Sequence, residues 1–335
     1  MSAAASVSEA EVQARVGRLG DLRAALAQAV VGQEAVVEQL LVGLLAGGHC
    51  LLEGVPGLGK TLLVRSLGQV LDLPFRRVQF TPDLMPSDIL GSEILEEDHG
   101  TGKRSFRFQP GPVFTSLLLA DELNRTPPKT QAALLEAMQE RTVSYAGVTH
   151  ALPRPFFVLA TQNPLEQAGT YPLPEAQLDR FLLHIRVDYP SETEERAILA
   201  QTTGAPVADP PRIMGAEEVL SLQAWVREVH LSPDLLAWIT RLVRATRPGD
   251  PGAPPEVATY VRYGAGPRAG QSLVLAAKAR ALLQGRLAAT RDDVRALAGP
   301  VMRHRLLMAF AAEAEGRSAD DVIAAVLRAT APAAA

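Results

Sequence analysis

A glycine-rich loop that begins at Gly54 has the residue types and spacing that bind phosphate. It fits the pattern G-x-x-x-x-G-K-[ST] at every fixed position and consists of Gly54, Val55, Pro56, Gly57, Leu58, Gly59, Lys60 and Thr61. Glycines allow successive backbone N–H groups to turn toward an anion, and the N-terminus of a following helix adds partial positive charge. The Lys60 ammonium can reach the β- and γ-phosphates, and the Thr61 hydroxyl can bind Mg²⁺. The loop therefore predicts a nucleoside triphosphate site.

The flanks of this loop favour a phosphate site over a glycine-rich turn that carries a lysine by chance. The run from His49 to Glu53 is typical of a short buried strand, and the run from Leu62 to Leu67 is typical of the start of a helix. A strand, a loop and a helix in this order form the context in which the pattern binds phosphate.

A second candidate is an acidic pair at the end of an apolar run. Leu117 to Ala120 predicts a strand buried on both faces, and Asp121 and Glu122 follow it directly. Open α/β sheets bind ligands at the carboxyl ends of their strands, so we expect the pair beside the phosphate loop. Asp121 would bind Mg²⁺, and Glu122 would polarise the attacking water. The pair favours a hydrolase over a kinase, which needs a second acceptor pocket; the alternative is a solvated pair at a strand end.

Three further polar residues could act at the same edge. Asn163 ends the next apolar run and could orient the water or contact the γ-phosphate, although an asparagine before a proline is also common in turns. Arg180 precedes the last predicted strand, where its fork of donors suits developing phosphoryl charge; a surface ion pair is the alternative. Arg268 lies at the start of a predicted helix, against the helix dipole, and this conflict hints at a functional reason for its position.

The bulk composition is that of an ordinary globular chain with two or three domains. The chain has 335 residues, 47% of them apolar and 21% charged, and a formal net charge of −4. This charge gives no global positive field for nucleic acid, although a local basic channel stays open. A single cysteine, Cys50, excludes a disulfide framework within the chain and suits a reducing compartment. The N-terminus lacks the features of a signal peptide, no membrane span is predicted, and the expected location is the cytoplasm.

The order of the predicted elements indicates a doubly wound α/β sheet. The predicted helices and strands cover residues 11–30, 35–46 and 130–139, and residues 49–53, 77–80, 117–120, 156–161 and 181–187, respectively. Strands that alternate with helices are typical of a parallel sheet with helices on both faces. Two stretches of alternating residues, 96–111 and 140–154, predict hairpins that depart from the sheet.

The composition changes near Tyr189 and marks a domain boundary. Beyond it the chain is rich in Ala, Leu and Arg and is predicted to be helical, with a Pro/Gly-rich interruption over 248–255. We therefore expect an N-terminal helical segment (1–30), an α/β core (31–190) and a smaller α-helical domain (191–335).

Together these stretches resemble the AAA+ ATPases and, within them, the MoxR family. The resemblance covers most of the chain, from about residue 30 to 270, and the following stretches carry it: Val31-Gly32-Gln33, Gly54 to Thr61, Gln79 to Leu84, Pro86 to Asp88, Asp121 to Arg125, Thr161 to Pro164, Pro174 to Phe181 and Gly264 to Arg268. The stretches at 79–88 and 124–125 are more specific to the family than the phosphate loop, which many folds share. One departure is Gly266, where relatives often carry serine, and we expect no consequence for catalysis.

The resemblance implies an AAA+ P-loop core, a parallel sheet flanked by helices, with a smaller C-terminal α-helical lid domain. It implies a catalytic set in which Glu122 activates water, Asn163 resembles sensor 1, Arg180 resembles the arginine finger given to a neighbour's nucleotide, and Arg268 resembles sensor 2. Thr61 and Asp121 form the implied metal site. The implied nucleotide-binding residues are Val31, Gly32, Gln33, Gly54, Pro56, Gly57, Leu58, Gly59, Lys60, Thr61 and Leu62. The two hairpins resemble the helix-2 insert and the pre-sensor-1 hairpin of this clade.

The implied activity is ATP hydrolysis with Mg²⁺ in a ring. If Arg180 acts on a neighbour, a single subunit is incomplete, and we expect a homo-oligomer, a hexamer by the resemblance. MoxR relatives are thought to be chaperone-like motors that remodel or mature partner proteins, often proteins with a von Willebrand A-type domain.

Two other kinds of motor stay open as alternatives. One is a nucleic-acid-stimulated, helicase-like motor, for which Lys103, Arg104 and Arg107 on the first hairpin would contact phosphates; the other is a metal-chelatase-type motor subunit. A solvated edge hairpin is the favoured interpretation of those basic residues, and no nucleic-acid partner is expected. A nucleotide-gated scaffold without hydrolysis is disfavoured by the intact pair Asp121 and Glu122.

Overall fold

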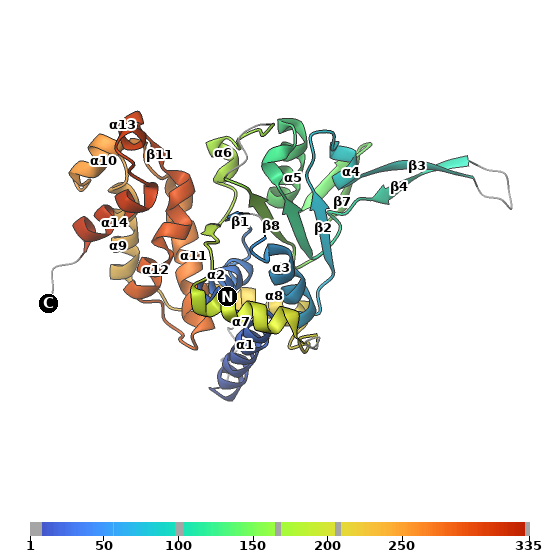
Figure 1. The fold of residues 1–335 in the computed structure, drawn as a ribbon, viewed down its shortest axis with the longest axis horizontal. Coiled ribbons are helices and arrows are strands. Elements are labelled where there is room, and N and C mark those ends of the chain that lie inside the picture. Colours follow the sequence, from blue (N-terminus) through green and yellow to red (C-terminus); the bar gives the residue numbers. More distant parts are fainter. Residues whose placement is uncertain (1–8, 56, 98–103, 165–168, 205–208, 332–335) are drawn as a thin grey trace, which may run out of the picture.

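The computed structural model describes residues 9–55, 57–97, 104–164, 169–204 and 209–331, so the predicted site residue Pro56 and the hairpin residue Lys103 lie outside the described residues. A sheet with covering helices lies beside a group of C-terminal helices, and a long hairpin projects from the opposite side of the sheet (Figure 1). No helix within the described ranges is both long and apolar enough to cross a membrane.

A five-stranded parallel sheet forms the centre of the N-terminal part. The strand order is β2 (Phe75–Gln79), β5 (Leu117–Asp121), β8 (Phe157–Gln162), β1 (Cys50–Glu53) and β9 (Leu183–Arg186). Every neighbouring pair is parallel, so the carboxyl ends of all the strands meet at one edge. The predicted parallel sheet is therefore confirmed. The last strand is shorter than predicted because Phe181 and Leu182 belong to the turn that precedes it.

Alternate residues of the three central strands, β5, β8 and β1, pack into two separate cores. Leu117 and Leu119 of β5 belong to one core, and Leu118 and Ala120 belong to the other. The first core is completed by helices α1 (Glu9–Ala29), α2 (Glu34–Leu45) and α3 (Lys60–Val70), and the second by α4 (Pro86–Leu90) and α5 (Pro128–Glu140). Because both faces are buried, these strands are continuous apolar runs rather than alternating ones.

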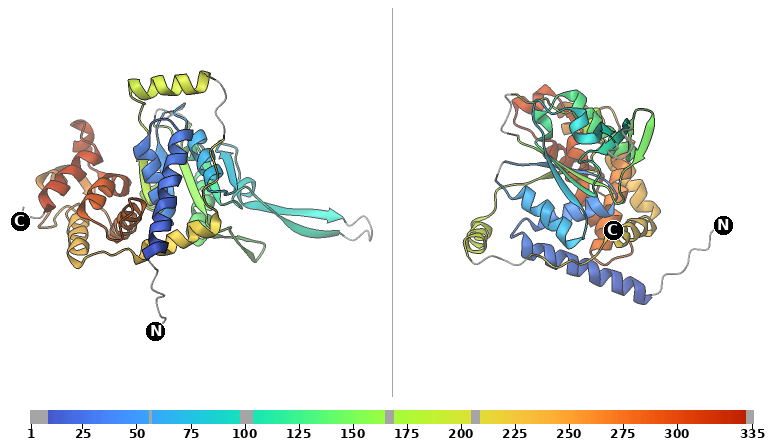
Figure 2. Two further views of the ribbon diagram at one scale, coloured as in Figure 1. Left: turned by 90° about the horizontal axis from the view of Figure 1, so that it is seen from below. Right: turned by 90° about the vertical axis from the view of Figure 1, so that its right-hand side faces the viewer.

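Three more helices follow β8 in the sequence. They are α6 (Glu175–Leu178), α7 (Glu192–Thr203) and α8 (Ala216–Glu228). Helix α8 packs against α2. Helix α7 contributes no buried residue and stands off the body of the protein, as Figure 2 shows.

The two predicted hairpins are present. The first pairs β3 (Gly91–Glu97) with β4 (Arg104–Pro110), and the second pairs β6 (Thr142–Tyr145) with β7 (Val148–Ala151). The first begins at Gly91, earlier than the predicted residue 96. Its long arm projects from the sheet in Figure 1 and in the left view of Figure 2. Near its base, the Phe108 ring stacks on the His150 ring of the second hairpin with centroids 4.2 Å apart, so the two hairpins are in contact.

The C-terminal part is mainly helical, as predicted. Its main helices are α9 (Pro233–Arg244), α10 (Pro255–Tyr260), α11 (Pro267–Leu283), α12 (Arg291–Met302), α13 (Phe310–Ala314) and α14 (Ala319–Thr330). A short antiparallel pair, β10 (Val261–Tyr263) with β11 (Leu307–Met308), was not predicted, because runs of two or three residues carry no periodic signal. The 3₁₀ turn Arg303–Arg305 follows α12. In this article the segment from α9 onward is called the lid.

The lid shares a hydrophobic core with one face of the sheet. The core that contains Leu117 and Leu119 also contains Leu273 and Ala277 of α11 and Leu297 of α12. Helix α11 packs on α2, and α12 packs on β9.

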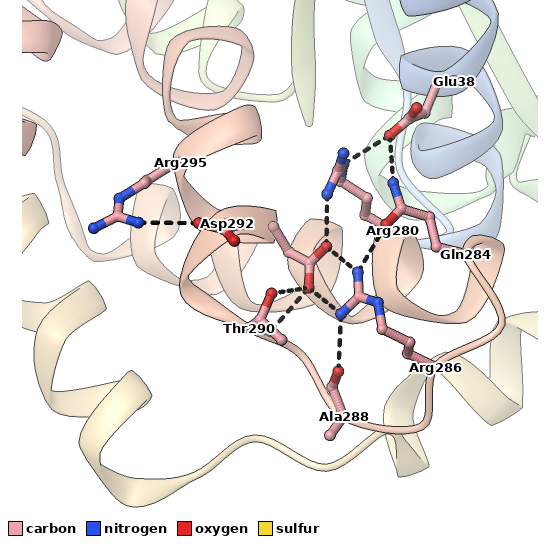
Figure 3. Close-up of polar contacts among 9 residues, drawn as sticks. Glu38, Arg280, Gln284, Arg286, Ala288, Thr290, Asp292 and Arg295 are labelled. Atoms are coloured by element: carbon pink, nitrogen blue, oxygen red, sulfur yellow. Dashed lines mark hydrogen bonds and ion pairs between the residues drawn. The ribbon is translucent and has the colours of Figure 1, made fainter.

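A cluster of charged residues joins the lid to α2 (Figure 3). Arg280 donates to Glu38 of α2 at 2.6 Å and to Asp293 of α12 at 2.8 Å. Asp293 is fully buried, also accepts from Arg286 at 2.6 and 2.8 Å, and caps α12 by accepting from the Thr290 N–H and hydroxyl. We call Glu38, Arg280, Arg286 and Asp293 the α2 junction.

Candidate active site

The phosphate loop has the backbone that its glycines allow. Gly57 and Gly59 have φ values of +87° and +72°, which residues with a Cβ rarely adopt. A Cβ added at either position would meet no atom within 4 Å, so the space beside both glycines is open. Gly59 is the N-cap of α3, whose first residue is Lys60. The open concave backbone at a helix N-terminus fits an anion such as a phosphate group.

Lys60 lies between this loop and the acidic pair. Its Nζ donates to the Gly54 carbonyl oxygen at 2.6 Å. Burial lowers the pKa of Lys60, and the nearby carboxylates of Asp121 and Glu122 oppose that shift. The ammonium therefore faces both predicted acids. Thr61 follows as the second residue of α3 and is partly buried, whereas the Leu62 side chain is half exposed.

Asp121 and Glu122 end β5, as predicted, and the neighbouring strand β8 fixes their positions. The Thr161 hydroxyl donates to Asp121 Oδ1 at 2.7 Å and accepts from the Glu122 N–H at 2.8 Å. Glu122 itself has a left-handed backbone, with φ 57° and ψ 49°. One side chain of β8 thus holds both members of the acidic pair at the edge where Lys60 lies.

Three residues that contact the acidic pair were not assigned this role from the sequence. Arg77 of β2 donates to Asp121 Oδ2 at 2.6 and 3.0 Å. Gln79 of β2 donates to Glu122 Oε2 at 2.7 Å, and Arg125 donates to the same oxygen at 2.9 Å. The sequence does contain a hint of these contacts, since Arg77 and Gln79 share one face of a strand that ends near a family-specific stretch. This hint predicts the contacts only when the strand order is known, because that order places β2 beside β5.

Asn163 directly follows β8 and is buried, with 6% of its surface exposed. It belongs to the same edge of the sheet as Asp121, because β5 and β8 are parallel neighbours. This position is consistent with the predicted contact to a phosphate or to water.

A cavity of about 950 Å³ opens beside the phosphate loop. Its lining includes Val31, Gln33, Gly57, Leu58, Gly59, Leu62, Tyr189, Ile198 and Leu199. Gln33 joins its two sides, since its Nε2 donates to the Leu58 carbonyl oxygen at 3.0 Å. Gly32 has a φ of +71°, and a Cβ there would lie 2.7 Å from Glu194 Oε1 of α7. This mostly apolar hollow, walled on its outer side by α7, has the size and lining of a site for a flat heterocycle such as adenine.

Arg180 and Arg268 lie apart from the acidic pair. Arg180 is partly exposed in the turn between α6 and β9, and its guanidinium makes no hydrogen bond or ion pair with the residues that the structure describes. Arg268 is the second residue of α11, as predicted, and its Nη1 lies 3.4 Å from Asp179 Oδ2. Within the described part of the chain, neither arginine contacts Lys60, Asp121 or Glu122.

The donor set at this edge suits a hard cation that is bound mainly through a nucleotide. Asp121 and Thr61 offer oxygen ligands, and Mg²⁺ is commonly bound by one or two such groups together with substrate phosphates. No group of three or more His, Cys, Asp or Glu side chains among the described residues could hold a metal by itself. The residues therefore fit a metal that arrives with a nucleotide, and not a permanent protein-only metal site.

Comparisons with known proteins agree with this geometry. Residues 49–183 match the model of the ATPase family associated with various cellular activities (AAA), and residues 255–326 match that of the AAA lid domain. The chain is 44% identical to the chaperone MoxR1 of Mycobacterium tuberculosis, over 89% of this chain and 78% of the relative. It is 37% identical to the protein MoxR of Paracoccus denitrificans, over 88% and 90% of the two chains.

A solved structure has the same fold. The crystal structure of a candidate ATPase from Cytophaga hutchinsonii superposes with a TM-score of 0.89 at 40% identity, and the match covers 96% of each chain. The AAA+ core and the C-terminal helical lid expected from the sequence are thereby confirmed, and so is the resemblance that suggested them. The chain belongs to the MoxR family of AAA+ ATPases.

Proposed function

We propose that this protein hydrolyses ATP to ADP and phosphate at the edge of the sheet where β1, β5 and β8 end. The backbone of the phosphate loop and Lys60 bind the phosphates, and the cavity beside Val31 and Gln33 receives the adenine. Glu122 accepts a proton from the attacking water, and Asn163 orients that water. Residues 31–190 then form the nucleotide-binding unit, and residues 191–335 form the second, α-helical domain.

One observation carries this proposal: an open glycine cradle, the Lys60 ammonium and an acidic pair lie at the same edge of the sheet. A cradle alone would bind anions, and an acidic pair alone would be a strand end. Together they would offer a bound phosphate chain both a cation and a water-activating carboxylate, as phosphoryl transfer requires. Thr61 and Asp121 would hold Mg²⁺, which supplies positive charge to the phosphate oxygens when it is bound.

We further propose that the active form is a ring, a hexamer by family resemblance, in which Arg180 completes the site of a neighbouring subunit. The Arg180 guanidinium has no hydrogen bond or ion pair among the described residues and lies away from its own acidic pair. An arginine finger stabilises transition-state charge only when it reaches the phosphates. The nucleotide bound to a second copy of the chain is the simplest source of phosphates that Arg180 could reach.

The work driven by hydrolysis is, in this proposal, the remodelling or maturation of partner proteins. The name of the relative from M. tuberculosis, chaperone MoxR1, supports this class of function. A protein with a von Willebrand A-type domain is the proposed partner class, on the resemblance alone.

The first hairpin gives little support to a nucleic-acid motor. Arg104 is paired with Glu97 at 2.9 Å, and Arg107 with Glu96 at 3.1 Å, so each described cation of this hairpin has an acid opposite it. A basic surface for a phosphate backbone needs unneutralised charge. No observation in the described structure favours a metal-chelatase-type motor.

The test of the finger is Arg180→Ala. We expect this variant to bind nucleotide normally and to lose about 10³-fold or more of its ATPase rate. Arg196→Ala is the matched control, because Arg196 is an exposed arginine that, among the described residues, pairs only with Glu192 on the same helix. ATPase assays and nucleotide titrations measure both effects, and an Arg180→Ala protein that turns over at the parental rate would remove the assignment.

The test of the water-activating residue is Glu122→Gln. The variant should bind ATP, assemble in the presence of Mg²⁺, and hydrolyse ATP very slowly, because an amide cannot accept the proton. The stalled form is also the form in which to search for partners by co-purification. Rapid hydrolysis by this variant would exclude Glu122 from the role.

A further inference from the structure

The turn that carries Arg180 is held by a buried arginine of the lid. Arg305 ends the 3₁₀ turn after α12, and its side chain is only 2% exposed. Its Nε donates to Asp179 Oδ1 at 2.7 Å, its Nη2 to the carbonyl oxygens of Phe181 at 2.7 Å and Asp179 at 3.3 Å, and its Nη1 to that of Leu182 at 3.3 Å. The other partners of this guanidinium, the Val301 carbonyl and the Ser272 hydroxyl, are in the lid itself. Arg305 therefore fixes the backbone on both sides of Arg180.

Asp179, next to Arg180, is shared by two arginines of the lid. Its Oδ1 binds Arg305, and its Oδ2 lies 3.4 Å from Arg268. The first contact is short and its arginine is buried, whereas the second is long and the Arg268 side chain is 48% exposed. Exposed ion pairs contribute little to stability, so Arg305 rather than Arg268 holds Asp179 in place.

We propose that Asp179 and Arg305 are positioning residues for Arg180, because together they fix the turn from which the Arg180 guanidinium would reach the neighbouring site. This inference rests on the proposed function, since it needs Arg180 to act in a neighbouring subunit. Arg305 supplies the buried attachment to the lid, and Asp179 links it to the residue next to Arg180.

The test is a mixed ring with one kind of productive interface. Finger donors carry Glu122→Gln, so that their own sites do not hydrolyse ATP, and site owners carry Arg180→Ala, so that they offer no finger. In the mixture, the only active sites are those of owners that receive Arg180 from a neighbouring donor. Asp179→Asn is then added either to the donors or to the owners. Asparagine keeps an oxygen for Arg305 and removes the charge that attracts Arg268.

We expect Asp179→Asn in the donors to lower kcat by about 10- to 100-fold with little change in KM for ATP, because a small displacement of a catalytic group has this effect. In the owners, the same change should alter kcat by less than about twofold, because their finger is already absent. Equal activity of the mixture with and without Asp179→Asn in the donors would overturn the inference. Loss of activity only when the change is in the owners would also overturn it, because this pattern is that of a residue supporting its own site.

Arg305→Met in the donors gives the second measurement. Arg303→Met is its matched control, because Arg303 lies in the same 3₁₀ turn but donates to Asp320 and to the His184 carbonyl oxygen instead of to residues 179–182. Arg305→Met should lower kcat in the donors and Arg303→Met should not, with thermal unfolding confirming that both fold; equal effects of the two would count against a specific role. The finger assignment is checked separately: if Arg180→Ala alone is fully active, the proposed function and this inference both fail.

Discussion

Two groups of charged residues attach the lid to the core, and they are built in opposite ways. In the α2 junction the buried group is an acid, Asp293, and its arginines Arg280 and Arg286 come from the lid itself. Around Arg180 the buried group is a cation, Arg305, and three of its six acceptors are carbonyl oxygens of the core. The α2 junction completes its hydrogen bonds within the lid and touches the core through Glu38. We call Arg305 and its contacts, together with Asp179 and Arg268, the finger junction. The hydrogen bonds of the finger junction depend on acceptors in the core.

This difference indicates different purposes. A network that is satisfied within the lid stabilises the lid whether or not the core moves. A network that is completed by the backbone of residues 179–182 makes the position of that backbone depend on the lid. We therefore expect changes in the α2 junction to alter stability, and changes in the finger junction to alter turnover.

The largest expected effect on stability is that of Asp293→Ala. The change leaves Arg280 and Arg286 beside each other without their shared acid, and loss of one partner of a buried ion pair costs about 3–5 kcal/mol. Urea unfolding should show this loss, while kcat per folded ring stays within about twofold. The control is Asp292→Ala, because the neighbouring Asp292 is 82% exposed and pairs only with Arg295 in the described structure. A large fall in kcat for well-folded Asp293→Ala would abolish the distinction between the junctions.

The next effect is a different response of the two junctions to pH. Burial, together with the nearby Arg305 and His184, holds the pKa of His304 well below its usual value, and His304 Nε2–H donates to the Phe181 carbonyl oxygen. The unfolded chain therefore takes up a proton near pH 6.5 that the folded chain refuses, so stability falls as the pH drops below about 6.5. The loss is at most about 1.4 kcal/mol per pH unit for one such histidine.

The α2 junction should not respond in this range. Burial opposes ionisation of Asp293, but hydrogen bonds from Arg286, Thr290 and Arg280 hold its pKa below the usual value of an aspartate. Its contribution to stability is present above that usual value and is lost only as the pH falls through the lowered pKa. Unfolding free energies of the parent and of His304→Gln at pH 7 and pH 5 measure the difference. His49, whose pKa burial lowers to about 4, remains in both proteins and cancels in the comparison; equal pH slopes for the two proteins would contradict the prediction.

The smallest expected effect is that of Glu38→Gln. This change removes the charge of Glu38, the core member of the α2 junction, but Arg280 keeps Asp293, and the glutamine can still accept a hydrogen bond. Loss of charge from such a partly exposed pair should cost less than about 1 kcal/mol, with no change in kcat. A loss as large as that of Asp293→Ala would show that the α2 junction depends on the core after all.

The parts of the fold and site that follow from neighbouring residues could be predicted from the sequence. The phosphate loop, the acidic pair after β5 and the start of α11 at Pro267 are patterns within a few consecutive positions, and the structure has the loop, the pair and the helix where they were expected. The hairpins were predicted from alternation, although the start at Gly91 was missed, because β3 is almost entirely exposed and shows no alternation between buried and exposed positions.

The contacts between distant segments could not be predicted in the same way. Arg77 reaches Asp121 because β2 lies beside β5, and no pattern within either strand gives their order. The Thr290 and Asp293 pair is a recognisable helix cap, but its arginines come from α11 and from the loop that follows it. The contacts of Arg305 are even harder to predict, because the sequence of a helical, arginine-rich segment does not show which arginine is buried.

The hydrophobic core that the lid shares with the sheet limits how the molecule can move. Leu273, Ala277 and Leu297 pack in the same cluster as Leu117 and Leu119, so wide hinge opening would bring this apolar surface into water. Small sliding of packed helices avoids that cost. A displacement of α11 across α2 would then move β9 and the phosphate loop together. Nucleotide turnover would therefore deform the lid and the sheet jointly.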